Sequence, residues 1–199
     1  PDSTTFSWID YSQVELRILG HVSHDTTMQD AFKLGISIHE LTMKELWPGA
    51  QRYTPNGEDS PEYLSSKTLN FAKVYGASDH QLYRKTGVPL ASIPQFRRTW
   101  SALYPQAEQW VDNQYDWPYD YVESEFGRRM ALPINVHNMK PHVFRAHRSK
   151  CAVNYPIQGT AADIIKRGMI KVKDTDTRLQ VHDELVFNGE VELDESLSR

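Results

Sequence analysis

Two aspartates far apart in the sequence have the placement of catalytic carboxylates. Asp10 follows the apolar segment Thr5 to Ile9, and Asp183 lies between two short apolar segments, so each can project from the end of a strand. Two converging carboxylates repel each other unless a cation lies between them, and hard oxygen ligands suit Mg²⁺ or Mn²⁺. Two such ions about 4 Å apart can activate a hydroxyl and stabilise the leaving oxygen of an in-line phosphoryl transfer. Taken alone, either aspartate could instead be a cap or a turn residue.

A helical face with one lysine and two aromatic residues could bind a nucleotide. Lys67, Phe71 and Tyr75 follow one another at intervals of four after Pro61, so in a helix they lie along one face. The lysine could neutralise a triphosphate, Phe71 could pack on the sugar and base, and Tyr75 could close the far end. The alternative interpretation is a core-facing aromatic stripe whose lysine reaches solvent.

The composition indicates a folded protein of a reducing compartment. The chain has 199 residues, of which 39% are hydrophobic and 11% aromatic, enough for a sizeable core. It has no apolar run long enough to cross a membrane, and residues 1–10 lack the order of a signal peptide. We therefore expect a bacterial or infected-host cytosol. Cys151 is the only cysteine, which excludes an internal disulfide and favours a buried thiol.

The charge is unevenly distributed along the chain. The formal net charge of -4 argues against a nucleic-acid-binding surface, yet residues 126–173 contain ten cations against one acid, Asp163. The ten are Arg128, Arg129, Lys140, Arg145, Arg148, Lys150, Lys166, Arg167, Lys171 and Lys173. This stretch is a candidate track for a polyanion, and the alternative interpretation is a solvated helix face.

Turn and capping patterns divide the chain into short strands and helices. Strands are expected at Thr5 to Ile9, Arg178 to Val181 and Leu185 to Phe187, with a small hairpin from Tyr121 to Phe126 and Met130 to Ile134. Helices are expected from Ser12, with Glu15 in a capping box, and at Thr27 to Leu34, Ser37 to Leu46, Pro61 to Tyr75, Ile93 to Leu103 and Phe144 to Val172, the last interrupted near Pro156. Gln51 to Ser60 has the composition of a loop. The pattern predicts an α+β architecture with helices on one face of an antiparallel sheet.

Three segments resemble, in the family's order, the motifs of family A DNA polymerases, the bacterial polymerase I type. They are DYSQVELR (Asp10 to Arg17), KTLNFAKVYG (Lys67 to Gly76) and QVHDELV (Gln180 to Val186). The blocks at Asp25 to His39, Tyr121 to Arg129 and Asn154 to Asp163 are also similar to that family. The resemblance covers essentially the whole chain and implies template-directed DNA synthesis by a DNA-directed DNA polymerase, with a phage or viral origin kept open.

The resemblance implies a role for each matching residue. Catalytic residues would be Asp10, Asp183 and Glu184, with Asp10, Asp183 and the carbonyl of Tyr11 as metal ligands for two Mg²⁺ ions that Mn²⁺ could replace. Nucleotide-binding residues would be Lys67, Phe71, Tyr75, Glu15, His39 and Gln13. Template or primer contacts would be Arg17, Asn154, Gln158 and His182. Glu15 would block a ribose 2'-hydroxyl together with Phe71 and Tyr75, although the residues alone also allow a capping acid.

One position departs from the family's pattern. Many relatives carry an arginine one helical turn before the lysine, and this chain has Tyr63 there. A tyrosine can donate one hydrogen bond but carries no charge, so nucleotide binding is expected to be weaker unless another cation substitutes. Lys73 points away from the Lys67 face and is a poor substitute. No gain in nucleotide affinity on Tyr63→Arg would contradict this hypothesis.

The resemblance also implies an arrangement of parts. It implies an antiparallel palm sheet with a helical fingers subdomain of the right-hand fold. Residues 1–48 would form part of the palm, residues 49–117 the fingers with a nucleotide-binding helix at about 61–75, and residues 118–199 the return to the palm. Thumb and exonuclease would be absent, so a truncated chain is expected to extend primers poorly. The expected partners are primer-template DNA and dNTPs, with neither a membrane nor an oligomer.

Three alternatives remain open at this point. A single-subunit RNA polymerase shares the two-aspartate palm, and Glu15 with Phe71 argues for deoxynucleotides instead. An inactive nucleic-acid-binding or nucleotide-binding fragment would not need Asp10, Asp183 and Lys67. A two-metal nuclease commonly uses further acidic ligands, which this sequence does not supply.

Overall fold

The computed structural model describes residues 5–134, 139–173 and 175–190. In chain order the first half contains β1 (Phe6–Asp10), α1 (Val14–Val22), α2 (Thr26–Lys33), α3 (Ile38–Leu46), α4 (Pro61–Val74), α5 (Asp79–Thr86) and the 3₁₀ helix η1 (Leu90–Ser92). The second half contains α6 (Ile93–Leu103), α7 (Pro105–Tyr115), β2 (Tyr121–Glu123), β3 (Arg129–Ala131), α8 (Pro141–Lys171), β4 (Thr177–Val181) and β5 (Glu184–Asn188). The α+β prediction is confirmed, and the expected strands and helices occur with ends shifted by a few residues.

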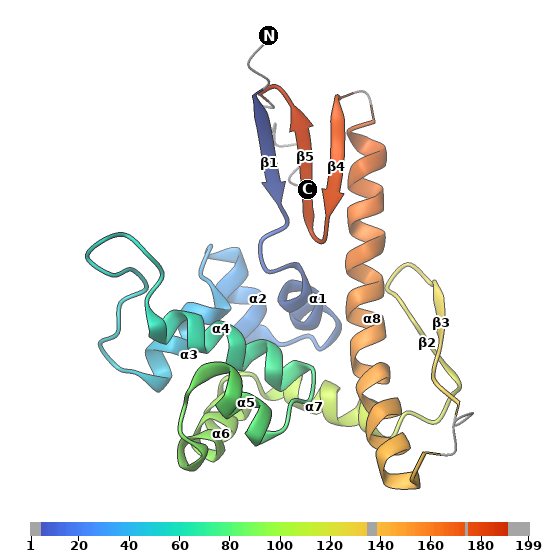
Figure 1. Ribbon diagram of the computed structural model, residues 1–199. Coiled ribbons are helices and arrows are strands. Elements are labelled where there is room, and N and C mark those ends of the chain that lie inside the picture. The colour runs from blue at the N-terminus through green and yellow to red at the C-terminus, as the bar shows by residue number, and fades with distance from the viewer. Residues whose placement is uncertain (1–4, 135–138, 174, 191–199) are drawn as a thin grey trace.

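A three-stranded antiparallel sheet joins the beginning of the chain to its last described strand. The strand order is β1-β5-β4, and the register places Asp10 opposite Glu184. One face of the sheet packs on α8, where Leu185 and Phe187 form a buried cluster with Ile165. Figure 1 shows the sheet standing at one end of the helices, with α8 running beside β4. The sheet therefore delivers the end of β1 and the β4–β5 turn to the same edge, beside α8.

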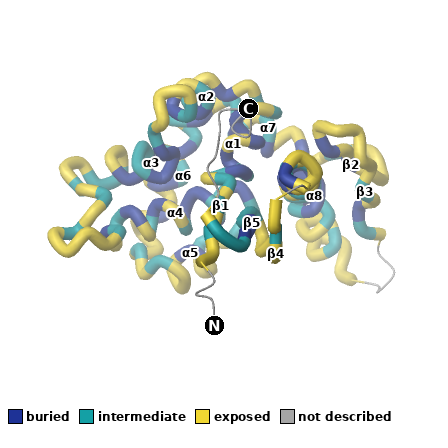
Figure 2. Tube along the Cα trace, turned by 90° about the horizontal axis from the view of Figure 1, so that it is seen from above, coloured by how far each residue is buried: buried dark blue, intermediate teal, exposed yellow. Residues whose placement is uncertain are grey.

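Most helices share a single hydrophobic core. The spacing of Ile93, Phe96 and Trp100 puts these residues on one face of α6, and all three are buried. The core extends from α1 through α7 and includes Val153 and Ile157 of α8. The buried stretches lie in Figure 2 on the sides of the helices that face one another. This shared packing holds α4 in place relative to α1 and α8.

Helix α8 runs without a break from Pro141 to Lys171, so the predicted interruption near Pro156 is wrong. A proline inside a helix removes one hydrogen bond and costs about 3 kcal/mol. Pro156 is buried. On one side of the helix, Ala152 belongs to a small buried cluster beside the β2–β3 hairpin, and on the other side Ile157 belongs to the core that the helices share. Packing on both sides of α8 offsets the backbone hydrogen bond that Pro156 removes. The helix preferences of single residues do not include such packing, so the sequence pattern could not predict it.

The start of α1 also differs from the prediction. The helix begins at Val14 instead of Ser12, and the preceding Gln13 adopts a left-handed conformation without a side-chain cap. Strand β1 stays paired with the last hairpin as far as Tyr11, whose N–H donates to the Asp183 carbonyl at 3.0 Å. The chain must then turn sharply before it can become helical, so the capping box of Ser12 and Glu15 does not form. Glu15 is thereby left available for other contacts.

Candidate functional site

The two predicted aspartates meet where β1 ends beside the β4–β5 turn. The backbone bond from Tyr11 to Asp183 and the pairing of Asp10 with Glu184 place three carboxylates together. His182 forms the turn with a positive φ of 53° and accepts a hydrogen bond from the Gln180 side chain through its carbonyl oxygen. Sequence reasoning predicted this convergence of the chain's two ends, and the sheet produces it.

The electrostatics of this cluster are unfavourable in the protein alone. Burial first, and then the charges of Asp183 and Glu184, raise the pKa of Asp10, whereas Lys67 lowers it. A divalent cation between the carboxylates would remove the repulsion, and the available donors are the hard oxygens that Mg²⁺ prefers. Among the described residues, no group of three or more His, Cys, Asp or Glu side chains could hold a metal ion by itself.

Helix α4 presents the predicted nucleotide-binding face. It begins at Pro61 after the cap Ser60, whose hydroxyl accepts from the Tyr63 N–H at 3.2 Å. Lys67 is exposed, and the rings of Phe71 and Tyr75 stack in parallel with centroids 6.3 Å apart. Lys73 lies elsewhere, in a 2.6 Å ion pair with Glu108, and so cannot replace a phosphate-binding cation on this face.

Glu15 of α1 and Gln158 of α8 lie beside Tyr75 at the end of this face. Burial, followed by the nearby Glu15 carboxylate, raises the pKa of the Tyr75 hydroxyl, and Gln158 acts in the opposite direction. The hydroxyl oxygen is buried, yet no described atom forms a hydrogen bond of regular geometry with it. Side chains from α1 and α8 thus lie beside this buried hydroxyl at the end of α4.

His39 is buried beside α4 in a fixed tautomer. Trp100 Nε1 and the Thr42 hydroxyl both lie 3.0 Å from Asn70 Oδ1, so this oxygen is the acceptor and the amide nitrogen faces His39 Nδ1 at 3.1 Å. Because the amide nitrogen can only donate, Nδ1 accepts and Nε2 carries the proton. Burial, then the charges of Lys67 and Arg52, lower the pKa of His39 to about 4. At neutral pH His39 thus offers one N–H donor and no charge.

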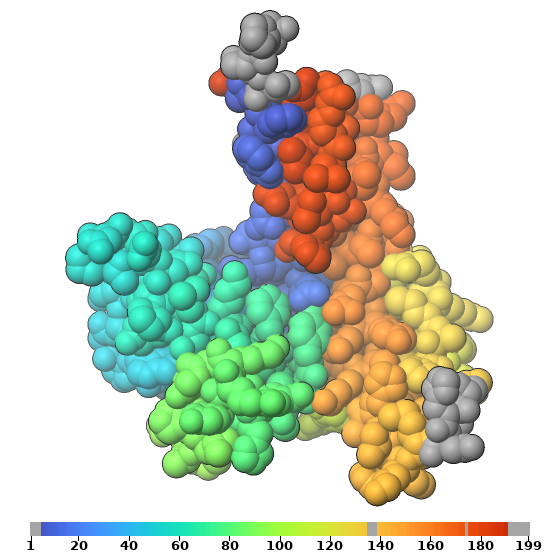
Figure 3. Space-filling view, viewed as in Figure 1, coloured from blue at the N-terminus to red at the C-terminus, as the bar shows by residue number. Residues whose placement is uncertain are grey.

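A hollow connects several of the predicted residues. It lies between α1, α8 and the β4–β5 turn, and its lining residues are Val14, Glu15, Gln158, Ala161, Ala162, Ile165, Lys166, Met169, Gln180, His182 and Asp183. Figure 3 shows the last hairpin and α8 meeting above the helices in this part of the molecule. The hollow unites four predicted residues from three separate motifs, whereas Asp10 lies just outside its lining.

Three further predicted residues, Arg17, Gln13 and Asn154, also do not line this hollow. Arg17 packs over the ring of Phe32 at 4.5 Å and lines a different hollow. The Gln13 side-chain oxygen accepts from the Ile38 N–H at 3.2 Å, so it serves the start of α3. Asn154 lies one turn before Gln158 on α8, and its buried side-chain oxygen has no partner among the described residues. Their assigned contacts with nucleotide, template or primer remain predictions.

Two cations near the site were not assigned to it from the sequence, where Lys166 was named only as part of the basic stretch and Arg52 not at all. Lys166 lines the hollow, and its position follows from the series Gln158, Ala161, Ala162, Ile165 and Met169, which is one helical face. That periodicity could have been read from the sequence. Arg52 lies near His39, but no spacing rule locates a residue of an irregular loop.

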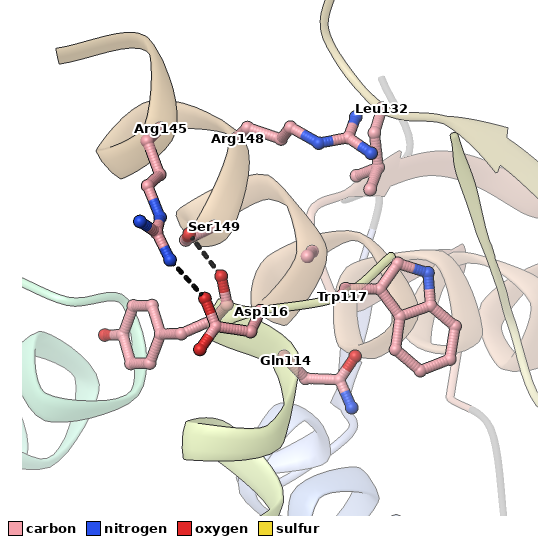
Figure 4. Close-up of a pocket in the computed structure, with 9 residues that line it drawn as sticks. Gln114, Asp116, Trp117, Leu132, Arg145, Arg148 and Ser149 are labelled. Atoms are coloured by element: carbon pink, nitrogen blue, oxygen red, sulfur yellow. Dashed lines mark hydrogen bonds and ion pairs between the residues drawn. The ribbon is translucent and has the colours of Figure 1, made fainter. Parts of the chain in front are cut away.

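Four of the ten cations of the basic stretch form ion pairs, three of them with acids from outside it. Arg128 pairs with Asp163, and three further arginines, Arg129, Arg145 and Arg148, pair with Glu123, Asp116 and Asp120. Figure 4 shows Arg145 and Arg148 projecting from α8 at a second hollow, where Asp116 and Trp117 follow the end of α7. This second hollow contains none of the predicted site residues, so it does not contribute to the acidic cluster.

Comparison with known proteins gives a consistent result along the chain. The family model "DNA polymerase family A" matches residues 1–198. DNA polymerase I of Deinococcus radiodurans is 34% identical over 99% of this chain and 21% of its own length. The thermostable DNA polymerase I of Thermus aquaticus is 33% identical over 96% of this chain and 23% of its own length.

A solved structure agrees with the sequence comparisons. The POL domain of Pol1 from M. smegmatis, in a complex with DNA primer-template and dNTP, superposes with a TM-score of 0.77 at 26% identity. The match covers 98% of this chain and 35% of that chain. This chain thus spans only about a fifth of the length of the curated relatives described above. These relatives are bacterial and give no support to a viral origin.

Proposed function

The chain belongs to DNA polymerase family A, and we propose that it carries the nucleotidyl-transfer site of a DNA-directed DNA polymerase. The observation that carries this proposal is the meeting of Asp10 and Asp183 beside Lys67, which comes from the middle of the sequence. The arrangement combines a cation-binding acidic cluster with a basic helix face. Such a combination suits a reaction in which charge on phosphate oxygens must be neutralised.

The proposed reaction joins a primer 3'-hydroxyl to the α-phosphate of a dNTP paired with the template. The new bond forms between the 3' oxygen and the α-phosphorus, the bond to the β-phosphate bridge breaks, and pyrophosphate leaves while the hydroxyl proton passes to solvent. Lys67 would neutralise the phosphates, and the Nε2–H of His39 would donate to one of them. Most of the rate enhancement would come from position and charge.

Metal dependence is general in this family, and two Mg²⁺ ions are our more specific proposal. Asp10, Asp183 and the Tyr11 carbonyl would hold them, with Glu184 as an auxiliary acid and Mn²⁺ as a substitute. When bound, the ions would lower the pKa of the attacking hydroxyl and stabilise the departing oxygen. The repulsion that Asp183 exerts on Asp10, which raises the pKa of Asp10, supports this assignment.

The Glu15 side chain would select the sugar. Glu15 lies beside the Tyr75 hydroxyl, and Phe71 stacks on the same tyrosine ring. A ribose 2'-hydroxyl would have to displace Glu15 from Tyr75, so a deoxyribose would bind preferentially. This arrangement favours a DNA polymerase over a single-subunit RNA polymerase.

The wider assignments follow from the same proposal. Residues 1–48 and 118–199 would contribute the palm and its connection, and residues 49–117 the fingers. Primer-template DNA would pass the face of α8 that carries Asn154 and Gln158, with His182 at the primer end. Within the described residues, none of the helices is both long and apolar enough to span a membrane.

Single-turnover incorporation tests the proposed function. Excess protein is mixed with a primer-template, Mg²⁺ and the one complementary dNTP, and primer length is followed with time. We expect addition of one nucleotide, a loss of more than about a hundredfold in Asp183→Asn, and no change in Asp30→Asn, an exposed aspartate of α2. Incorporation that survives Asp183→Asn, or that prefers an NTP, would contradict the proposal and favour one of the alternatives.

A further inference from the structure

The loop at residues 51–60 holds an arginine against the nucleotide-binding helix. The Arg52 guanidinium lies 4.6 Å from the ring centroid of Tyr63 and 4.8 Å from that of Tyr53. Its Nε donates to Asp59 at 3.2 Å, and its two terminal nitrogens form no hydrogen bond with the described residues. The side chain is about one third exposed, so its charged end is fixed in direction and still reaches solvent.

The loop is ordered by its own backbone bonds. The Ser60 N–H donates to the Arg52 carbonyl at 2.7 Å, and the Thr54 N–H donates to the Glu58 carbonyl at 2.8 Å. Gly57 permits the tight turn between them with a φ of 82°. Because Ser60 is also the cap of α4, the loop and the helix form one continuous unit. Ser60 thus both bonds to the Arg52 backbone and caps the nucleotide-binding helix.

Arg52 and Lys67 act on the same imidazole from different elements. Tyr63 lies one turn before Lys67 on α4, is only 6% exposed, and meets the His39 ring edge-on with centroids 6.1 Å apart. The charges of Lys67 and Arg52 both bear on His39. The three groups thus form a row in which Lys67 lies nearer to Asp10, and Arg52 lies at the opposite end beside Tyr63.

We propose that Arg52 is the second phosphate-binding cation of the site and grips the terminal phosphate of the incoming triphosphate. This inference rests on the proposed function. A triphosphate carries more negative charge than one lysine can neutralise, and a guanidinium with two unengaged terminal nitrogens can bind phosphate oxygens in pairs. The row then matches the ligand, with the α-phosphate near Asp10 and Lys67 and the terminal phosphate near Arg52. Tyr63 acts as the platform that orients the guanidinium.

Titration calorimetry with purified protein can test this assignment. The probes are dGTP, dGMP and inorganic tripolyphosphate, each with Mg²⁺, and the variants are Arg52→Gln and Lys67→Gln. We expect Arg52→Gln to weaken dGTP and tripolyphosphate about tenfold and to leave dGMP unchanged, because dGMP lacks the terminal phosphate. Lys67→Gln should weaken all three ligands. Arg98→Gln, an exposed arginine of α6, is the matched control and should change nothing.

A purely structural role for Arg52 predicts a different pattern. If Arg52 only ties the loop through Asp59, then Asp59→Asn should reproduce the effect of Arg52→Gln, with a lower unfolding midpoint in both. If Arg52 binds phosphate, Asp59→Asn should leave dGTP affinity intact. Loss of affinity in Lys67→Gln but not in Arg52→Gln would overturn the inference and leave the proposed function standing. If the unaltered protein bound neither dGTP nor tripolyphosphate, both would fall.

Discussion

At the residue scale, Asp10 is held in an environment that opposes its own charge. Its pKa is raised by burial and by two neighbouring acids, so the folded state binds its proton more tightly than the unfolded chain does. The free energy of unfolding therefore decreases as the pH rises through that pKa. At neutral pH the ionised carboxylate destabilises the folded state. A charged group that destabilises its own fold is typical of a site built for a ligand.

Asp10→Asn should therefore stabilise the protein while it abolishes catalysis. Without divalent ions at neutral pH, we expect a higher unfolding midpoint in the variant, because the repulsion from Asp183 and Glu184 is gone. Incorporation should fall by more than about a hundredfold. Adding Mg²⁺ should raise the midpoint of the unaltered protein more than that of the variant. Thermal unfolding by circular dichroism, with and without Mg²⁺, checks both statements, and a lower midpoint for Asp10→Asn in metal-free buffer would refute this explanation.

His39 gives a pH dependence of the opposite kind. Its pKa falls from 6.5 to about 4 on folding, so the stability that it contributes is complete above pH 6.5 and is lost as the pH falls toward 4. The side chain is 2% exposed, and the full change corresponds to about 3 kcal/mol. Urea unfolding of the unaltered protein and of His39→Gln between pH 7 and pH 4 should show a shallower loss in the variant. Equal slopes would show that His39 is not the titrating group.

At the element scale, the contact between the Asp10–Tyr11 segment and α8 depends on a glycine. A side chain at Gly168 would overlap the hydroxyl of Tyr11, which lies directly over the helix there. The absence of a side chain thus lets the end of β1 approach α8 closely. Tyr11 in turn is bonded through its backbone to Asp183, so this packing connects α8 to the segment that carries the acidic pair.

Gly168→Ala should consequently displace the site although it favours the helix. Helix preference alone would stabilise α8 by about 1 kcal/mol, whereas forced overlap costs about 1 to 3 kcal/mol. We expect a net loss of stability together with reduced incorporation. Removing the clashing hydroxyl in the double variant Tyr11→Phe, Gly168→Ala should recover much of both losses. Urea unfolding and single-turnover kinetics provide the test, and no recovery in the double variant would mean that the contact is unimportant.

The elements also show where sequence reasoning succeeds and fails. Periodic segments such as α4 and α6 were predicted correctly because their buried faces repeat at helical spacing. The predicted start of α1 was wrong because β1 pairs with β5. This long-range contact makes the helix begin two residues later than the local pattern indicates. The break at Pro156 was wrong because tertiary packing outweighs a local penalty. Lys166 could have been found from helix geometry, whereas the position of Arg52 depends on a loop conformation.

At the scale of the whole molecule, the proposed function requires an acidic chain to bind DNA. The net charge of the chain is -4. Four arginines of the basic stretch are paired with acids and so contribute little free positive charge. The cations that remain for DNA phosphates include Lys166, which lines the hollow beside Asp183. The overall charge is thus a poor guide to the local surface, because several acids are paired with arginines of the basic stretch.

The salt dependence of DNA binding should separate these two classes of cation. Each lost phosphate contact lowers the slope of log affinity against log salt concentration by about one. Lys166→Gln should show that decrease, whereas Arg145→Gln should leave the slope unchanged because Asp116 already engages this arginine at 2.6 Å. Fluorescence anisotropy with a labelled primer-template at several salt concentrations gives both slopes. A larger effect from Arg145 than from Lys166 would reverse our assignment of the DNA-binding face.

The proposed reaction requires that Asp10 and Asp183 share divalent ions beside Lys67. Titration with Mn²⁺ in the presence of dGTP, followed by electron paramagnetic resonance, measures this directly. We predict two bound ions in the unaltered protein, a weaker or missing ion in both Asp10→Asn and Asp183→Asn, and full binding in Asp30→Asn. Unchanged Mn²⁺ binding in the Asp10 and Asp183 variants would contradict the account.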